Sequence, residues 1–154
     1  LCTALTALSQ LSSSQLLSIS SLYASKPLGP QDQPDYFNAV AALKTELEPL
    51  ALLDALQLQE REQGRVRRRH WGERCIDLDM LLLGDTQWHC PRLTLPHKEL
   101  THRSFTLIPL AELDPHLCLP DGRCVSQLTP SFDGELQRYQ HSGFQDCCQQ
   151  LLGR

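Results

Sequence analysis

The sequence Cys75-Ile76-Asp77-Leu78-Asp79-Met80-Leu81-Leu82-Leu83 is an apolar run that only two aspartates interrupt. The run is followed by Gly84-Asp85, a pair that favours a turn. Its length is typical of a strand, because helices generally extend over more residues. We therefore expect a strand over residues 75–83 and a short return strand over residues 86–89.

The segments on either side of this run show both helical and strand patterns. Leucines at positions 1, 5, 8 and 11 indicate a helix over residues 1–11. Pro49 fits the first turn of a helix that ends near Gln63, before Gly64. We further expect strands over residues 16–25 and 36–47, a helical turn over 96–102, and helices over 105–113 and 135–152. Because these elements are interleaved without a regular βαβα repeat, the α+β class is favoured.

The composition of the 154-residue chain, with 41% hydrophobic and 21% charged residues, is typical of one globular domain. It excludes fibrous and largely disordered proteins, and no apolar run approaches the roughly 20 residues of a membrane span. No charged stretch precedes the first apolar residues, so a signal peptide is not supported. Because the chain begins at Leu1 rather than Met, we expect that it has been trimmed.

The seven cysteines do not form a recognisable disulfide framework. Their number is odd, the only close pair is the adjacent Cys147-Cys148, and no Cys-x-x-Cys occurs. A chain of this length can build a core without disulfides. We therefore expect reduced thiols in a cytosolic protein.

Positive charge is concentrated in one stretch of an acidic chain. The net charge is −4, yet residues 61–74 contain six arginines and only two glutamates. Such a cluster indicates a confined site for a highly charged anion such as a phosphate chain, with Trp71 as a neighbouring aromatic surface. The alternative is a solvated basic loop. Neither a P-loop nor a kinase-type glycine loop is present.

Asp77 and Asp79 are two residues apart in the apolar run. On a strand their side chains would point to the same side, about 6.6 Å apart along the chain. Two carboxylates on one face repel each other, and Mg²⁺ is the cation that such hard oxygen ligands suit. The alternative is that both aspartates lie on an exposed face without a ligand. A carboxylate pair beside an arginine cluster favours transfer of a phosphorus-containing group.

Four further side chains are candidates for ligand binding. His97 follows Pro96 between two arginines, although a lone histidine is more often structural. Tyr36 and Asn38 share one face of a predicted strand, and Phe105 is a second isolated aromatic residue. Two rings with an amide between them could hold a flat heterocycle, while core packing is the alternative.

Four motifs then occur in order along the chain. They are Ser25-Lys26-Pro27-Leu28-Gly29-Pro30-Gln31-Asp32-Gln33-Pro34-Asp35-Tyr36-Phe37-Asn38-Ala39, His70-Trp71-Gly72-Glu73-Arg74-Cys75-Ile76-Asp77-Leu78-Asp79-Met80-Leu81, Arg92-x-Thr94-x-Pro96-His97 and Arg103-x-Phe105. Together they closely resemble the motifs of the 6-hydroxymethyl-7,8-dihydropterin pyrophosphokinase family. The resemblance covers residues 1–121.

The resemblance implies an enzyme of folate biosynthesis that transfers diphosphate from ATP to the pterin hydroxymethyl group and releases AMP. It implies a ferredoxin-like α+β sandwich with a mainly antiparallel sheet, acting as a cytoplasmic monomer without nucleic-acid or membrane partners. We expect the enzyme domain to cover residues 1–128, followed by a weakly helical tail over residues 129–154.

The resemblance also assigns roles to individual residues. Two Mg²⁺ ions would be held by Asp77 and Asp79. The pterin would be bound by Ser25, Leu28, Tyr36, Asn38 and Phe105. ATP would be bound by Gln57, Glu60, Arg67, Trp71, Arg92, Thr94, His97 and Arg103. Catalysis would depend on Asp77, Asp79, Arg65, Arg74 and His97.

The sequence departs from the family at its start, where members have a strand and a Gly-Ser-Asn loop before the first helix. We expect this absence to expose the edges of the strands at residues 16–25 and 75–83 and to lower stability. The alternative function is an RNA-binding module that uses the arginine cluster and Trp71. RNA binding would leave Asp77 and Asp79 unexplained, and it would not require Mg²⁺.

Overall fold

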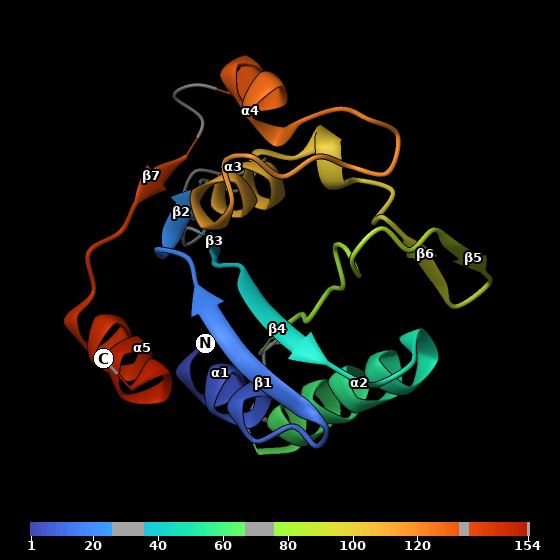
Figure 1. Cartoon of the computed structure of the whole chain (residues 1–154). Helices are drawn as coiled ribbons and strands as arrows, with labels where there is room; N and C mark the ends of the chain where they lie inside the picture. The colour runs from blue at the N-terminus through green and yellow to red at the C-terminus, as the bar shows by residue number, and fades with distance from the viewer. Residues whose placement is uncertain (26–35, 67–75, 133–135, 154) are drawn as a thin grey trace.

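The computed structural model describes residues 1–25, 36–66, 76–132 and 136–153 (Figure 1). Helices and short antiparallel strands are interleaved along the chain, so the predicted α+β class with antiparallel sheets is confirmed. The sheets are small: β1 pairs with β4, β5 pairs with β6, and β2 lies between β3 and β7.

The first helix and the central strand pair form one side of the molecule. Helix α1 (Cys2–Ser9) confirms most of the helix predicted over residues 1–11. Strand β1 (Ser14–Ile19) pairs antiparallel with β4 (Ala41–Thr45), with a bulge between Leu16 and Ser18. α1 packs against β1 through the buried side chains of Leu5 and Leu8.

The two long strands predicted from the sequence are each split in two. The chain leaves β1 and forms β2 (Tyr23–Ser25), while β3 (Tyr36–Asn38) precedes β4. At both breaks Ser20 and Val40 face each other: the Ser20 backbone N–H donates to the Val40 carbonyl at 2.8 Å, and the Ser20 hydroxyl accepts from the Val40 N–H at 2.9 Å. A side-chain oxygen thus replaces a backbone partner, and the strands change sheets there.

Helix α2 (Pro49–Val66) begins as predicted but continues past Gly64, so the predicted stop there is wrong. A glycine inside a helix costs only about 1 kcal/mol relative to alanine, which does not by itself end the helix. Its apolar face, with Leu52, Leu53 and Leu56, is buried in the main core cluster together with Met80.

The segment over residues 76–83 is extended, but it is not a strand, which corrects the prediction for residues 75–83; Cys75 itself lies outside the described residues. Its backbone groups bond outside a strand ladder: the Leu78 N–H donates to Glu60, and the Leu81 carbonyl accepts from the His97 N–H. A ladder needs a neighbouring strand, and the described part of the chain has none alongside this segment.

The partner predicted for the return strand is also wrong. β5 (Trp88–Cys90) does not return along residues 76–83 but pairs with β6 (Leu93–Leu95) in a separate hairpin. That hairpin projects from the side of the molecule (Figure 1).

The second half of the chain is mainly helical. The helical turn predicted over residues 96–102 is present as the 3₁₀ helix η1 (Leu100–His102), and the next predicted helix is confirmed as α3 (Ser104–Leu113). After α4 (Val125–Leu128) and η2 (Thr129–Phe132), the chain forms β7 (Gln137–Arg138) and α5 (Ser142–Leu152). The helix predicted over residues 135–152 is therefore right only from Ser142 onward.

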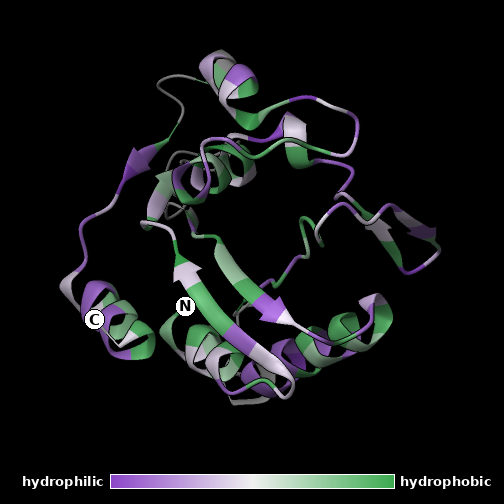
Figure 2. Ribbon diagram, viewed as in Figure 1, coloured by the Kyte–Doolittle hydropathy of each residue, from purple (hydrophilic) through white to green (hydrophobic). Residues whose placement is uncertain are grey.

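Helix α5 returns to the start of the chain. Hydrophobic and hydrophilic residues alternate around it (Figure 2), and its apolar side packs on α1 and β1. Cys2 and Cys147 form a disulfide between α1 and α5, with a Cα–Cα distance of 6.2 Å. The prediction that all thiols are reduced is therefore wrong, because two helices that are remote in sequence pack side by side. No helix of the described residues is long and apolar enough to cross a membrane.

Candidate active site

A cavity of about 560 Å³ opens beside β4, between α1, α2, α3 and residues 76–83. Most of its walls are apolar, Phe105 among them, and Asn38, Asp77 and Asp79 contribute polar groups. These four residues come from β3, from the extended segment and from the start of α3. The structure therefore brings both predicted metal ligands and two predicted pterin-binding residues to one cavity.

Asp77 and Asp79 both line the cavity. Both residues are exposed, whereas the intervening Leu78 packs against the main core cluster. In the described part of the chain, no cluster of three or more histidine, cysteine, aspartate or glutamate residues forms a complete metal cage. Two exposed carboxylates fit Mg²⁺, which takes few protein ligands and completes its shell with water and substrate phosphates.

Glu60 fixes the segment that carries these aspartates. Its Oε2 accepts a hydrogen bond from the Leu78 backbone N–H at 2.7 Å. Sequence reasoning expected Glu60 to contact ATP, but here its carboxylate is occupied by the backbone between the two aspartates. Glu60 lies about one helical turn from Gln57, so the sequence indicated the correct face of α2. It did not indicate the contact with the Leu78 N–H.

Arg92 and Gln57 are brought together, as expected for two residues of one predicted nucleotide site. The Nη2 of Arg92 donates to Gln57 Oε1 at 3.0 Å and to Asp54 Oδ1 at 2.6 Å. Asp54 had not been singled out. Its spacing of three residues from Gln57 on α2 was the available signal, because residues three apart share a helix face.

His97 follows Pro96, whose peptide bond with Leu95 is cis. Two hydrogen bonds fix its position. Its backbone N–H donates to the Leu81 carbonyl at 2.8 Å, and its ring Nδ1 accepts from the Glu99 N–H at 3.0 Å. An accepting Nδ1 assigns the ring proton of the neutral imidazole to Nε2. The ring can therefore donate a hydrogen bond through Nε2.

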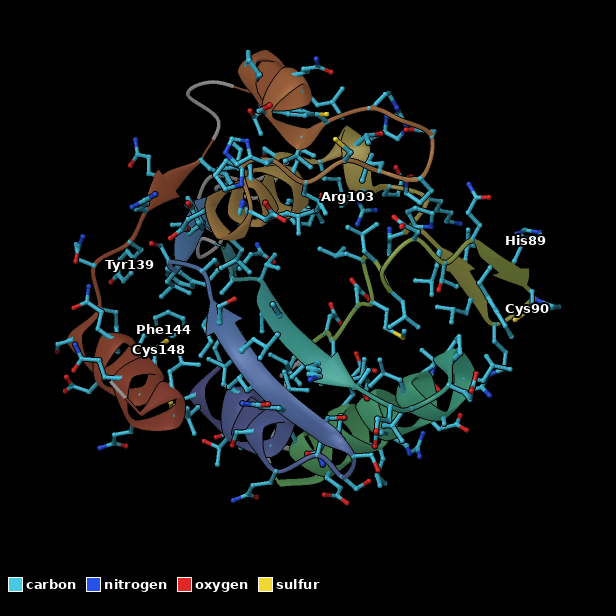
Figure 3. The ribbon with its side chains drawn as sticks, viewed as in Figure 1. His89, Cys90, Arg103, Tyr139, Phe144 and Cys148 are labelled. Carbon is cyan, nitrogen blue, oxygen red and sulfur yellow. A yellow bond between two sulfur atoms is a disulfide. The ribbon has the colours of Figure 1, made fainter. Side chains whose placement is uncertain are left out.

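Thr94 lies on β6, and its hydroxyl is 3.3 Å from Nδ1 of His89 on the neighbouring strand. Figure 3 places His89 and Cys90 on the outer side of this hairpin. Thr94 is therefore near a histidine that sequence reasoning did not select.

Arg103 and Phe105 are adjacent at the start of α3. The Arg103 guanidinium lies 5.5 Å from the centroid of the Phe105 ring. The Thr106 hydroxyl donates to the carbonyls of Leu100 and Arg103, at 2.8 and 2.9 Å. A predicted triphosphate contact and a predicted pterin contact are therefore fixed next to each other.

The remaining predicted residues are described in part or not at all. Ser25 and Tyr36 face each other in the β2–β3 register, and Arg65 lies in the last turn of α2, with only their backbones described. The residues outside the described part of the chain are Leu28, Arg67, Trp71 and Arg74.

Comparison with known proteins supports this picture. Residues 1–115 match the family model for 7,8-dihydro-6-hydroxymethylpterin-pyrophosphokinase. The chain belongs to this family. It is 54% identical over 129 residues to the 2-amino-4-hydroxy-6-hydroxymethyldihydropteridine pyrophosphokinase of Haemophilus influenzae, covering 84% of this chain and 81% of that protein.

Two other relatives show how far the similarity extends. The pyrophosphokinase of Pseudomonas aeruginosa is 54% identical over 125 residues, covering 81% of this chain and 77% of the relative. The folic acid synthesis protein fol1 of Schizosaccharomyces pombe is 40% identical over 118 residues, which are 77% of this chain but 16% of that protein. The family and the pyrophosphokinase activity predicted from the motifs are confirmed.

Proposed function

We propose that this pyrophosphokinase binds ATP and 6-hydroxymethyl-7,8-dihydropterin at the cavity lined by Asp77, Asp79, Asn38 and Phe105. There it transfers diphosphate to the pterin hydroxymethyl group and releases AMP. The observation that carries this proposal is the meeting of the two carboxylates with an amide and an aromatic ring in one cavity. A carboxylate pair suits a metal-bound phosphate, and a ring beside an amide suits a flat, polar-edged heterocycle.

Asp77 and Asp79 would hold two Mg²⁺ ions. When bound, Mg²⁺ neutralises the charge that develops on the phosphate oxygens during transfer. Glu60 contributes by fixing the backbone at Leu78, between the two aspartates. Without a cation these like charges repel each other, which favours metal binding together with ATP.

The triphosphate would be contacted by three donor side chains. Arg92 presents its guanidinium beside Gln57, and His97 can donate through Nε2. Arg103 lies at the start of α3. Each carries a proton on nitrogen, as binding to phosphate oxygens requires. The same site would include Glu60, Thr94, Arg65, Arg67, Trp71 and Arg74.

The pterin would lie between the rings of Tyr36 and Phe105. The Asn38 side chain has both a donor and an acceptor and can read the polar edge of the heterocycle. The backbones of Ser25 and Leu28 would complete this recognition. The register of β2 and β3 places Ser25 opposite Tyr36 and Tyr23 opposite Asn38. This register supports a single pterin site that includes Ser25, Tyr36 and Asn38.

The proposal extends to the setting of the enzyme. We place the catalytic domain at residues 1–128 in a ferredoxin-like arrangement, with residues 129–154 as a tail, and we expect a cytoplasmic monomer. The Cys2–Cys147 disulfide provides a check on the compartment, because cytosolic thiol systems keep most protein cysteines reduced. With thiols blocked at lysis, a reduced pair would support the cytoplasmic location, and an intact Cys2–Cys147 disulfide would argue against it.

The test is AMP release at saturating Mg²⁺ by Asp77→Asn and Asp79→Asn variants. Each change keeps the side-chain volume but removes one anionic ligand, so turnover should fall by orders of magnitude while the fold is kept. Asp85→Asn is the matched control, because Asp85 lies in the turn after the same segment and does not line the cavity. Near-parental rates for both cavity variants would refute the proposal. Mg²⁺-independent binding of an ATP analogue would favour the RNA-binding alternative instead.

A further inference from the structure

The last part of the chain packs back onto the strands that carry the proposed pterin site. Strand β7 pairs antiparallel with β2, placing Arg138 opposite Tyr23 and Gln137 opposite Ala24. The Tyr139 backbone N–H donates to the Leu22 carbonyl at 2.8 Å. β7 therefore covers the edge of β2 that faces away from β3. This tail strand lies beyond residues 1–115, which match the family model.

Arg138, Tyr23 and Asn38 lie side by side across this sheet and connect the tail with the cavity. Tyr23 is opposite Arg138 on one side and opposite Asn38 on the other. The Arg138 guanidinium lies 5.9 Å from the centroid of the Tyr23 ring, and its Nη2 lies 4.0 Å from Glu112 Oε2. The Tyr23 hydroxyl donates to Glu112 Oε1 at 2.7 Å. Arg138 and Glu112 thus fix the residue that pairs directly with Asn38.

A second contact joins the tail to β3 across the sheet. The rings of Phe37 and Tyr139 meet edge to face, with their centroids 5.0 Å apart. Ala24 is opposite both Phe37 and Gln137, the residue two before Tyr139. The tail therefore contacts β3 directly as well as through β2.

Helix α5 anchors the far end of the tail. His141 caps the helix by accepting the Phe144 N–H at 3.0 Å on its ring Nδ1. Phe144, labelled on α5 in Figure 3, is buried in the same cluster as Leu5 and Leu8 of α1. Cys147 is bonded to Cys2. Strand β7 is thus connected to an element with a fixed attachment to the core.

We propose that β7 and Tyr139 form a strap that positions strands β2 and β3 for pterin binding, with Arg138 and Tyr139 as positioning residues. Neither residue is assigned a contact with the substrate. They act through Tyr23 and Phe37 on the strand that carries Asn38. This inference rests on the proposed role of Asn38 in binding the pterin.

The test is steady-state kinetics of the full chain carrying Arg138→Ala and Tyr139→Ala together. KM for the pterin should rise about fivefold, the order expected for loss of one hydrogen-bond-scale contact, while KM for ATP and kcat change little. Arg123→Ala is the matched control, because Arg123 is an exposed arginine paired with Asp121 on another loop. An unchanged pterin KM, or an equal rise in both KM values, would overturn the proposal.

Two further measurements separate the possible failures. Asn38→Ala should raise the pterin KM by itself; if it does not, the proposed pterin site is wrong rather than the strap. Hydrogen exchange of the backbone amides in β2 and β3 should be faster in the double variant, while exchange in α2 is unchanged. Unaltered exchange in β2 and β3 would show that the tail does not hold them.

A separate observation concerns two cysteines that face each other near α4. Cys118 and Cys124 pair across an isolated antiparallel bridge. The Leu119 N–H donates to the Arg123 carbonyl at 2.7 Å, and the Val125 N–H donates to the Leu117 carbonyl at 3.0 Å. These bonds flank the cysteines, which therefore form a non-hydrogen-bonded pair. Such pairs have Cα atoms about 4.5 Å apart, within the range that a disulfide spans.

We infer that Cys118 and Cys124 are a site of reversible oxidation by low-molecular-weight disulfides. One thiolate attacks the reagent and forms a mixed disulfide, releasing one reduced thiol. The second cysteine then attacks the bound sulfur and releases the other, so that two protein thiols are oxidised and one reagent disulfide is reduced to two thiols. Hydrogen bonding to Cys124 raises the pKa of the exposed Cys118 thiol.

The probe is oxidised glutathione, added to the full chain and followed by mass spectrometry of its peptides. The peptide pair with Cys118 and Cys124 should lose two hydrogens and become cross-linked, whereas Cys90 and Cys148 should carry only glutathione adducts. In a Cys118→Ser variant, Cys124 should retain a glutathione adduct. Separate stable adducts on Cys118 and Cys124 of the unaltered chain would contradict the inference.

Discussion

Glu60 shows how one carboxylate can act on the proposed metal site without being one of its proposed ligands. Its hydrogen bond to the Leu78 N–H fixes the backbone between the two proposed ligands. Replacing Glu60 by a residue without an acceptor would leave the Leu78 N–H without its partner in a half-buried segment. The cost would be about 1–3 kcal/mol. The directions of Asp77 and Asp79 should then be less well defined.

We predict that Glu60→Ala lowers kcat for AMP release by about tenfold. The variant loses the one hydrogen bond that positions the backbone between the two carboxylates, and the free energy of one hydrogen bond corresponds to a change in rate of this order. Glu60→Gln, which keeps an acceptor oxygen, should restore much of the rate. The exposed neighbour Glu62→Ala is the control and should behave like the parent. If Glu60→Gln were as slow as Glu60→Ala, a charge-dependent contact with substrate would explain the residue better.

Tyr23 provides a prediction about pH. Burial, followed by the hydrogen bond to Glu112, raises the pKa of the Tyr23 phenol above its ordinary value of 10.0. Its contribution to the free energy of unfolding is therefore complete below the unfolded-state pKa and is lost as pH rises through the folded-state value.

The measurement is a urea midpoint at neutral pH and at about pH 11. The fall in midpoint should be smaller in Tyr23→Phe than in the parent, because the variant has no phenol at this position to titrate. Equal falls in the two proteins would mean that another group controls alkaline stability.

At the scale of elements, helix α2 carries both part of the proposed nucleotide site and part of the core. Gly64 lies in its last turn, where the backbone remains helical. Because glycine loses more conformational freedom than alanine in a helix, Gly64→Ala should stabilise the protein by up to about 1 kcal/mol. Thermal melts check this, with Gly84→Ala as a contrasting variant. Gly84 has a φ of +56°, which disfavours alanine, so that change should destabilise.

The positions of the elements show what the sequence could predict. Apolar spacing correctly placed α1, α2 and α3, and the ordered motifs selected Asn38, Asp77, Asp79 and Phe105 before the cavity that they share was known. The breaks between β1 and β2 and between β3 and β4 depend on the Ser20–Val40 pairing, which residue patterns do not reveal. The partners of Glu60 and Arg138 are likewise set by tertiary packing.

At the scale of the whole molecule, the disulfide joins the first helix to the last. Cys2 and Cys147 are 145 residues apart, and closing a loop that long restricts the unfolded chain strongly. The loss of chain entropy in the unfolded state corresponds to about 4–5 kcal/mol for loops of this order.

We predict that Cys147→Ser lowers the melting temperature under non-reducing conditions by several degrees. Cys148→Ser is the matched control, since its thiol lies next in sequence and is not in the disulfide. A reducing agent should lower the parent to the level of Cys147→Ser and leave that variant unchanged. Identical melts for the parent with and without reductant would show that the cross-link adds nothing to stability.

The same bond makes the covalent structure of this protein a closed ring from Cys2 to Cys147. A protease that cuts once within the ring, for example at the exposed Gly84-Asp85 turn, would open the ring without releasing a fragment. The nicked protein would keep its full mass on a non-reducing gel and separate into two pieces only after reduction. Proteolytic damage to this enzyme would then remain hidden until its thiols are reduced.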